Sequence, residues 1–208
     1  DCNNYSTGGW DMQRCNETVD ITIEAGTVIG TVGGSSATQT NFDFGVMDED
    51  IHLEFINEDF YPSSQYSMAC PFDYYDHDTQ STLENYLGLY QDDTFTPRTI
   101  EPICGEVMQD AEGTAKGNWL SPAYKSSFTS EDPHIGLFDY NYDPTYEVFS
   151  LGPDSGVTTN AYFTYFVPTS NGQSNRSFED ITPDGLVYCF NSIASDPGIT
   201  DTHFRILL

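Results

Sequence analysis

The 208-residue chain carries 33 acidic residues against six lysines and arginines, which gives a formal net charge of −27 at pH 7. Binding to phosphates requires clustered basic residues, so this balance argues against nucleic acid and against an anionic membrane surface as partners. Aromatic residues make up 14% of the chain, enough for a folded core, and no apolar run of ~18 residues would span a membrane.

Residues 1–18 are polar and irregular in pattern. Cys2 and Cys15 flank a glycine-rich turn there, and we expect them to form a disulfide. Three cysteines remain, and among these we expect Cys104 to pair with Cys189, which leaves Cys70 unpaired. The chain starts at Asp1 with neither Met nor an apolar leader, which indicates a processed form or a fragment.

Three N-x-S/T sequons predict glycosylation in a secreted protein. They begin at Asn4, Asn16 and Asn175. Together with the cysteines and the acidic surface, they favour an extracellular or cell-surface location in an oxidising setting.

Alternating apolar residues predict strands in the first part of the chain. Residues 19–33 are expected to form strand, turn and strand, because Val19, Ile21 and Ile23 alternate with polar residues. The same period of two predicts strands over 41–47 and 51–55.

The spacing of leucines and tyrosines over 76–90 predicts the single helix, which Asp76 or Asp78 would cap. The polar loop 91–102 is expected to link two domains, a β region with the helix (1–90) and an antiparallel β domain (103–208). Short strands separated by turn residues are predicted at 103–109, 115–120, 134–139, 146–151, 161–167, 185–190 and 203–208. The expected fold is all-β, mainly an antiparallel sandwich or barrel, with one short helix.

Residues 25–61 contain the turn Gly26-Thr27-Val28-Ile29-Gly30, followed by the strand Asn41-Phe42-Asp43-Phe44-Gly45-Val46. This pattern resembles the core of the M23 (lysostaphin/LytM-type) zinc peptidases, where a Gly-x-x-Ile-Gly turn leads to a strand His-x-His-Phe-Gly-Val. The resemblance implies a degenerate form of that family's β fold, the duplicated hybrid motif. Residues 104–120 and 175–190 look similar to uncharacterised secreted bacterial proteins that join such a core to a second β region.

The resemblance also implies that the zinc chemistry is lost. The family's two histidines fall on Asn41 and Asp43, and the family's His-x-x-x-Asp motif has no match. Asn41 cannot accept a proton near neutral pH. Asp43 can still bind a metal, but in a harder, oxygen-based site.

A second candidate metal site is the run Asp139-x-Asn141-x-Asp143, whose alternate oxygens suit calcium. Pro144 and Ser150 stand where an EF-hand has its glycine and its bidentate glutamate, so the run is either another kind of calcium loop or a solvated acidic turn. The four histidines form no H-x-H or H-E-x-x-H pattern, so zinc is not expected. No catalytic residue is assigned.

Two functions fit this sequence. The first is a secreted non-catalytic β-protein for extracellular assembly or cell-surface binding, with further copies of itself or a cell-wall or glycan ligand as partners. The alternative is a metal-dependent cell-wall hydrolase with a remodelled M23-like site at Asp43.

Overall fold

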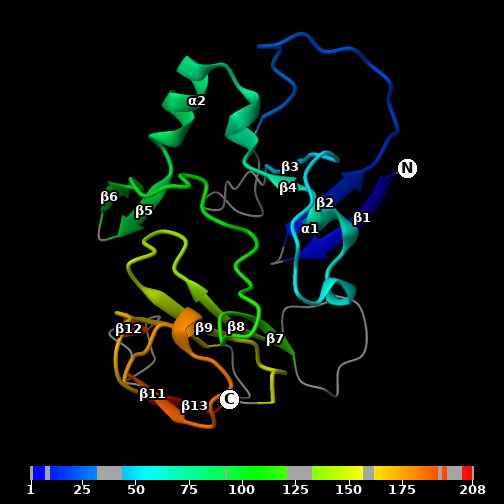
Figure 1. Cartoon of the computed structure of the whole chain (residues 1–208). Helices are drawn as coiled ribbons and strands as arrows, with labels where there is room; N and C mark the ends of the chain where they lie inside the picture. The colour runs from blue at the N-terminus through cyan, green and yellow to red at the C-terminus, as the bar shows by residue number, and fades with distance from the viewer. Residues whose placement is uncertain are drawn as a thin grey trace. The chain divides into compact units, whose positions relative to one another are not determined.

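The computed structural model describes residues 2–7, 10–31, 44–91, 93–120, 133–156, 162–191, 194–195 and 203–207. Its internal contacts divide the chain into two units, Asp1–Phe44 and Gly45–Leu208 (Figure 1). The division falls at residues 44 and 45, and the predicted linker 91–102 lies within the second unit. The predicted fold class is confirmed, because the regular secondary structure of the described residues is mostly strand in antiparallel pairs.

The first unit contains a hairpin of β1 (Cys2–Thr7) and β2 (Trp10–Cys15), although the sequence suggested irregular structure there. Cys2 lies opposite Cys15, and the expected disulfide joins them across the open end of the hairpin. The Ser6 hydroxyl donates to Asp11 Oδ1 at 2.6 Å, which adds a polar cross-strand contact. The covalent closure therefore fixes the register of a polar strand pair.

The strand, turn and strand predicted over 19–33 is not formed in the described residues up to Thr31. A turn does form, in which the Thr27 amide donates to the Glu24 carbonyl, but only Gly26, its second central residue, has positive φ (83°). Tight hairpins require positive φ at the first central residue, because other turns splay the flanking chain. The two arms therefore do not pair.

In the second unit, β3 (Val46–Met47) pairs with β4 (Met68–Ala69), and the strand predicted over 51–55 is absent. Short helical turns surround this pair: η1 (Glu58–Phe60), α1 (Ser63–Tyr66) and η2 (Pro71–Tyr74). The Leu53 amide donates a hydrogen bond to the Tyr66 carbonyl at 2.7 Å, so this segment contacts α1 as a loop and does not pair as a strand.

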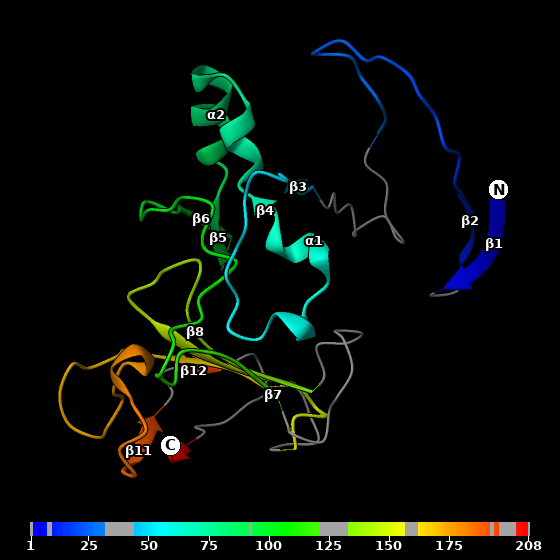
Figure 2. The ribbon, with the colours of Figure 1, turned by 45° about the vertical axis from the view of Figure 1, so that its right-hand side comes forward.

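The predicted helix is present as α2 (His77–Glu84), and the carboxylate of Asp76 accepts from the amides of Asp78 and Thr79 as its N-cap. It ends earlier than expected because Gly88 begins β5 (Gly88–Gln91), which pairs with β6 (Thr94–Pro97). Gly88 lies so close to the Thr96 carbonyl that a Cβ atom would not fit. Figures 1 and 2 show β5 and β6 between α2 and the largest sheet of this unit.

The largest sheet has five antiparallel strands in the order β12-β10-β9-β8-β7. Six of the seven strands predicted in the second half occur within a few residues of their expected bounds, whereas 103–109 forms no strand. The sheet contains β7 (Gly117–Leu120), β8 (His134–Asp139), β9 (Glu147–Leu151), β10 (Tyr162–Phe166) and the unpredicted β12 (Ala194–Ser195), and a separate pair is formed by β11 (Val187–Asn191) and β13 (His203–Leu207).

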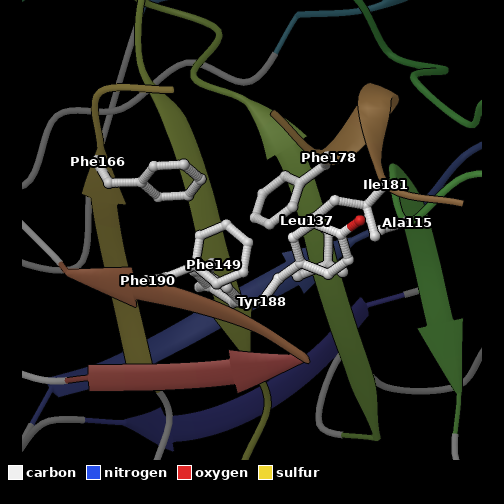
Figure 3. Close-up of a cluster of buried hydrophobic side chains, with 8 residues drawn as sticks. All are labelled: Ala115, Leu137, Phe149, Phe166, Phe178, Ile181, Tyr188 and Phe190. Atoms are coloured by element: carbon white, nitrogen blue, oxygen red, sulfur yellow. The ribbon is translucent and has the colours of Figure 1, made fainter. Parts of the chain in front are cut away.

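One face of this sheet carries the core, as Figure 3 shows. Phe149 in β9 contacts Phe178 of η3 (Phe178–Asp180) and Phe190 of β11, each with ring centroids 5.0 Å apart in edge-to-face geometry. The cluster consists of Ala115, Leu137, Phe149, Phe166, Phe178, Ile181, Tyr188 and Phe190. The alternation of each strand thus turns one set of side chains into the core and the other set outward.

The predicted disulfide between Cys104 and Cys189 is wrong. Cys104 is bonded to Cys70, with 5.8 Å between their Cα atoms, and Cys189 is a free thiol. Cys189 lies in β11, whose backbone there bonds to Gln173 and Asn175, whereas Cys104 lies in the loop after β6. The disulfide connectivity therefore depends on where the fold places each cysteine, and the spacing of the cysteines in the sequence does not reveal it.

None of the described helices has the length and apolar character needed to cross a membrane.

Candidate functional site

The outer face of the five-stranded sheet, opposite the core cluster, carries a group of aromatic side chains. In β10, Thr164 and Phe166 are buried, so Phe163 and Tyr165 point to the other side. Tyr165 lies opposite Val148 of β9, so both side chains are on this outer face, where Val148 is buried. We call Tyr140, Tyr142, Tyr146, Phe163 and Tyr165 the aromatic face.

Tyr140 lies at the centre of the aromatic face. Its ring stacks on Tyr165 with centroids 5.5 Å apart and an interplanar angle of 4°. Tyr142 and Phe163 contact the same ring at 5.5 and 5.9 Å. Tyr142 is 50% exposed and Phe163 37% exposed, so these two rings present open surface beside a fixed stack.

The turn between β8 and β9 positions three of the five rings. The Tyr140 amide donates to the Tyr146 carbonyl at 2.9 Å, and the Tyr146 amide donates to the Asp143 carbonyl at 3.0 Å. The Asp143 carboxylate accepts from the amide and hydroxyl of Thr145 and so closes the turn. Burial, with the neighbouring Tyr142 and Tyr165, raises the pKa of Tyr140, so its phenol stays a neutral hydrogen-bond donor.

The side chains of Asp139, Asn141 and Asp143 are each engaged by other groups in the structure. Asp139 Oδ2 accepts from Lys116 Nζ at 2.7 Å. Asn141 Oδ1 accepts from the Glu106 amide at 3.0 Å, and its Nδ2 donates to the Glu106 carbonyl. Asp143 bonds within its own turn. A shared calcium ion would have to displace these partners, and no group of three or more His, Cys, Asp or Glu residues in the described part of the chain could hold a metal.

We expect calcium to raise the melting temperature no more than sodium does at matched ionic strength. Asp139→Asn should lower the free energy of unfolding by about 1 to 3 kcal/mol, because it leaves the largely buried ammonium of Lys116 with only its longer ion pair, to Glu179 at 3.7 Å. The loss should be the same with and without calcium in thermal unfolding. A steep rise in the melting temperature at low calcium that Asp139→Asn abolishes would establish the calcium site instead.

A buried carboxylate that sequence reasoning missed lies on the core side of the sheet. Glu147 is 3% exposed, and its carboxylate accepts from the Ser177 hydroxyl at 2.6 Å and from the Phe178 amide at 2.9 Å. Burial raises its pKa to about 7, even though these two hydrogen bonds and the charge of Lys116 act in the opposite direction. In the sequence it is one acid among 33, and only its position before Val148-Phe149 in a predicted strand distinguishes it.

The remaining predicted site residues are distributed over both units. Asn41 and Asp43 lie outside the described residues. Asn4 and Asn16 are exposed in and after the hairpin, whereas Asn175 is partly buried and its Oδ1 accepts from the Asn191 amide at 2.8 Å.

No protein-family model, curated protein or solved structure matches this chain. The M23 resemblance of residues 25–61 therefore stays a prediction, and the function proposed below is based on the geometry and charge of the chain itself.

Proposed function

We propose that this chain is an extracellular, non-catalytic β-protein that binds glycans through its aromatic face. The observation that carries the proposal is the stack of Tyr140 on Tyr165 with Tyr142 and Phe163 open beside it. The C–H faces of a pyranose ring are apolar and pack on aromatic rings, while its hydroxyls need polar partners. Tyrosine offers both, because it has an apolar ring and a polar tip.

The net charge of the chain limits the classes of ligand that the aromatic face can bind. Nucleic acid bases also stack on aromatic rings, but their backbone requires a positively charged groove. With a net charge of −27, the protein repels polyanions. Of the few cations, Lys116 is engaged by Asp139 and Arg176 by Asp180. The aromatic face therefore suits neutral or amine-bearing glycans and disfavours uronic acid or sulfated ones.

The extracellular part of the proposal is supported by two disulfides and by the acidic surface. The hydrolase alternative depends on Asp43, which the structure does not describe, so no described geometry favours it.

We expect Tyr142→Ala and Phe163→Ala each to weaken glycan binding by roughly threefold to tenfold, since one aromatic contact contributes about 0.5 to 1.5 kcal/mol. Calorimetric titrations would compare hexasaccharides of β-linked glucose, N-acetylglucosamine, glucosamine and a uronic acid. Tyr86→Ala is the matched control, because Tyr86 is 75% exposed and lies outside the aromatic face.

Tyr86→Ala should bind like the unmodified protein, and the uronic acid hexasaccharide should bind least. The proposal fails if the unmodified protein binds none of the hexasaccharides, or if both variants of the aromatic face bind as well as the control.

A further inference from the structure

The segment Thr18–Glu24 of the first unit forms neither helix nor strand, and its sequence alternates apolar and polar residues; we call it segment 18–24. Val19, Ile21 and Ile23 are 60%, 66% and 50% exposed. Between them stand Asp20 and Thr22. Within the described part of residues 17–31, the one backbone hydrogen bond is that of the turn, from the Thr27 amide to the Glu24 carbonyl.

Such a segment has two unmet requirements. Its β-branched side chains favour a pleated sheet in which one side is covered. Its backbone amides and carbonyls, apart from the Glu24 carbonyl in the turn, have no backbone partner among the described residues, and a strand can pair with them. The turn after Glu24 splays the chain and so does not supply that strand from residues 27–31.

We propose that segment 18–24 pairs antiparallel with segment 18–24 of a second copy, about a two-fold axis at Ile21. In this register Ile21 lies opposite Ile21 of the other copy, and Val19 lies opposite Ile23. The polar side then places Asp20 opposite Thr22 and Thr18 opposite Glu24. Each carboxylate therefore faces a threonine hydroxyl that can donate to it, and the interface is self-complementary, as a two-fold contact requires.

Charge selects this register from its neighbours. A two-fold axis through a residue keeps apolar positions opposite apolar ones, whereas an axis midway between two residues would place each apolar side chain opposite a polar one. Centring on Thr22 would place Asp20 opposite Glu24, and centring on Asp20 would place two aspartates opposite each other. Like charges directly opposite are destabilising, so the arrangement about Ile21 is favoured.

The net charge of the chain predicts how the stability of the dimer depends on salt. Each copy carries −27, so the two copies repel each other at low ionic strength. Monovalent salt screens this repulsion and should therefore strengthen the dimer. An interface held by ion pairs between copies would weaken under the same change.

The test is sedimentation equilibrium of the full chain at several salt concentrations. Ile21→Lys should raise the dissociation constant of the dimer about a hundredfold or more, because it removes a buried isoleucine pair and places two ammonium groups face to face. Thr22→Lys adds the same charge on the polar side, opposite Asp20, and should leave the dimer intact or tighter. Both variants should retain the melting temperature of the second unit, because position 21 lies outside its core.

A cross-link provides a second readout. In a Cys189→Ser background, Ile21→Cys should form a disulfide-linked dimer on oxidation, since opposed positions in a strand pair have Cβ atoms about 4.5 to 5.5 Å apart. Ile29→Cys, at a position beyond the turn that is even more exposed than Ile21, should cross-link far less.

The proposal is overturned if the protein is a monomer at all concentrations and salt levels, or if it dimerises and Ile21→Lys has no effect. Tyr142→Ala should leave the dimer unchanged, so this result is independent of glycan binding.

Discussion

Phe178→Ala should lower the free energy of unfolding by about 3 to 5 kcal/mol, because truncation of a fully buried aromatic ring removes its burial and leaves a cavity. Phe178 has 0% exposure and contacts Phe149, Phe166 and Phe190 with centroids between 5.0 and 5.3 Å. Its carbonyl also accepts from the Ala115 amide at 3.2 Å, so its position links η3 to the start of β7.

Urea unfolding followed by near-ultraviolet circular dichroism would measure this loss. Tyr86→Ala removes a ring of similar size from an exposed position and should stay within about 0.5 kcal/mol of the unmodified protein. If Phe178→Ala were equally mild, the aromatic cluster would not be the core of this unit.

Glu147→Gln should stabilise the protein above neutral pH by about 3 kcal/mol and remove part of its pH dependence. The folded pKa of about 7 lies above the unfolded value of 4.5, so the folded state binds the proton more tightly. Between these two values the folded state holds more protons, and stability falls as pH rises. The contribution is fully present below pH 4.5 and lost above about pH 7.

Glutamine preserves the contacts without the charge. Its carbonyl can accept from the Phe178 amide while its amide donates to the Ser177 hydroxyl oxygen, at the positions of the two carboxylate oxygens. Folding free energies measured from pH 4 to pH 9 would test this.

The measured quantity is the difference between Glu147→Gln and the unmodified protein, because the other carboxylates also titrate. Glu112→Gln makes the same charge change at an exposed position and serves as the control for the loss of one carboxylate from the surface. A Glu147→Gln profile parallel to that of the unmodified protein would show that Glu147 does not titrate in this window.

Local patterns predicted the second half of the fold well. Residues 134–139, 146–151 and 161–167 alternate between turn residues, and the structure has β8, β9 and β10 there. Asp76 also caps α2 as expected, because a cap depends on amides two and three residues away. The same local rules were wrong for residues 19–31, where one turn geometry decides whether the arms can pair.

The sequence by itself therefore determined the β class, the approximate positions of the second-half strands, and the net negative charge from which we expect no nucleic-acid partner. Only the tertiary structure decided that Tyr140 and Tyr142 belong to the candidate site, in place of the Asp and Asn residues that alternate with them in the sequence. It did so because Asp139 and Asn141 are engaged by Lys116 and Glu106, which lie 23 and 35 residues away. Side-chain partners at such separations depend on how the strands pack, and alternation along one strand carries no information about them.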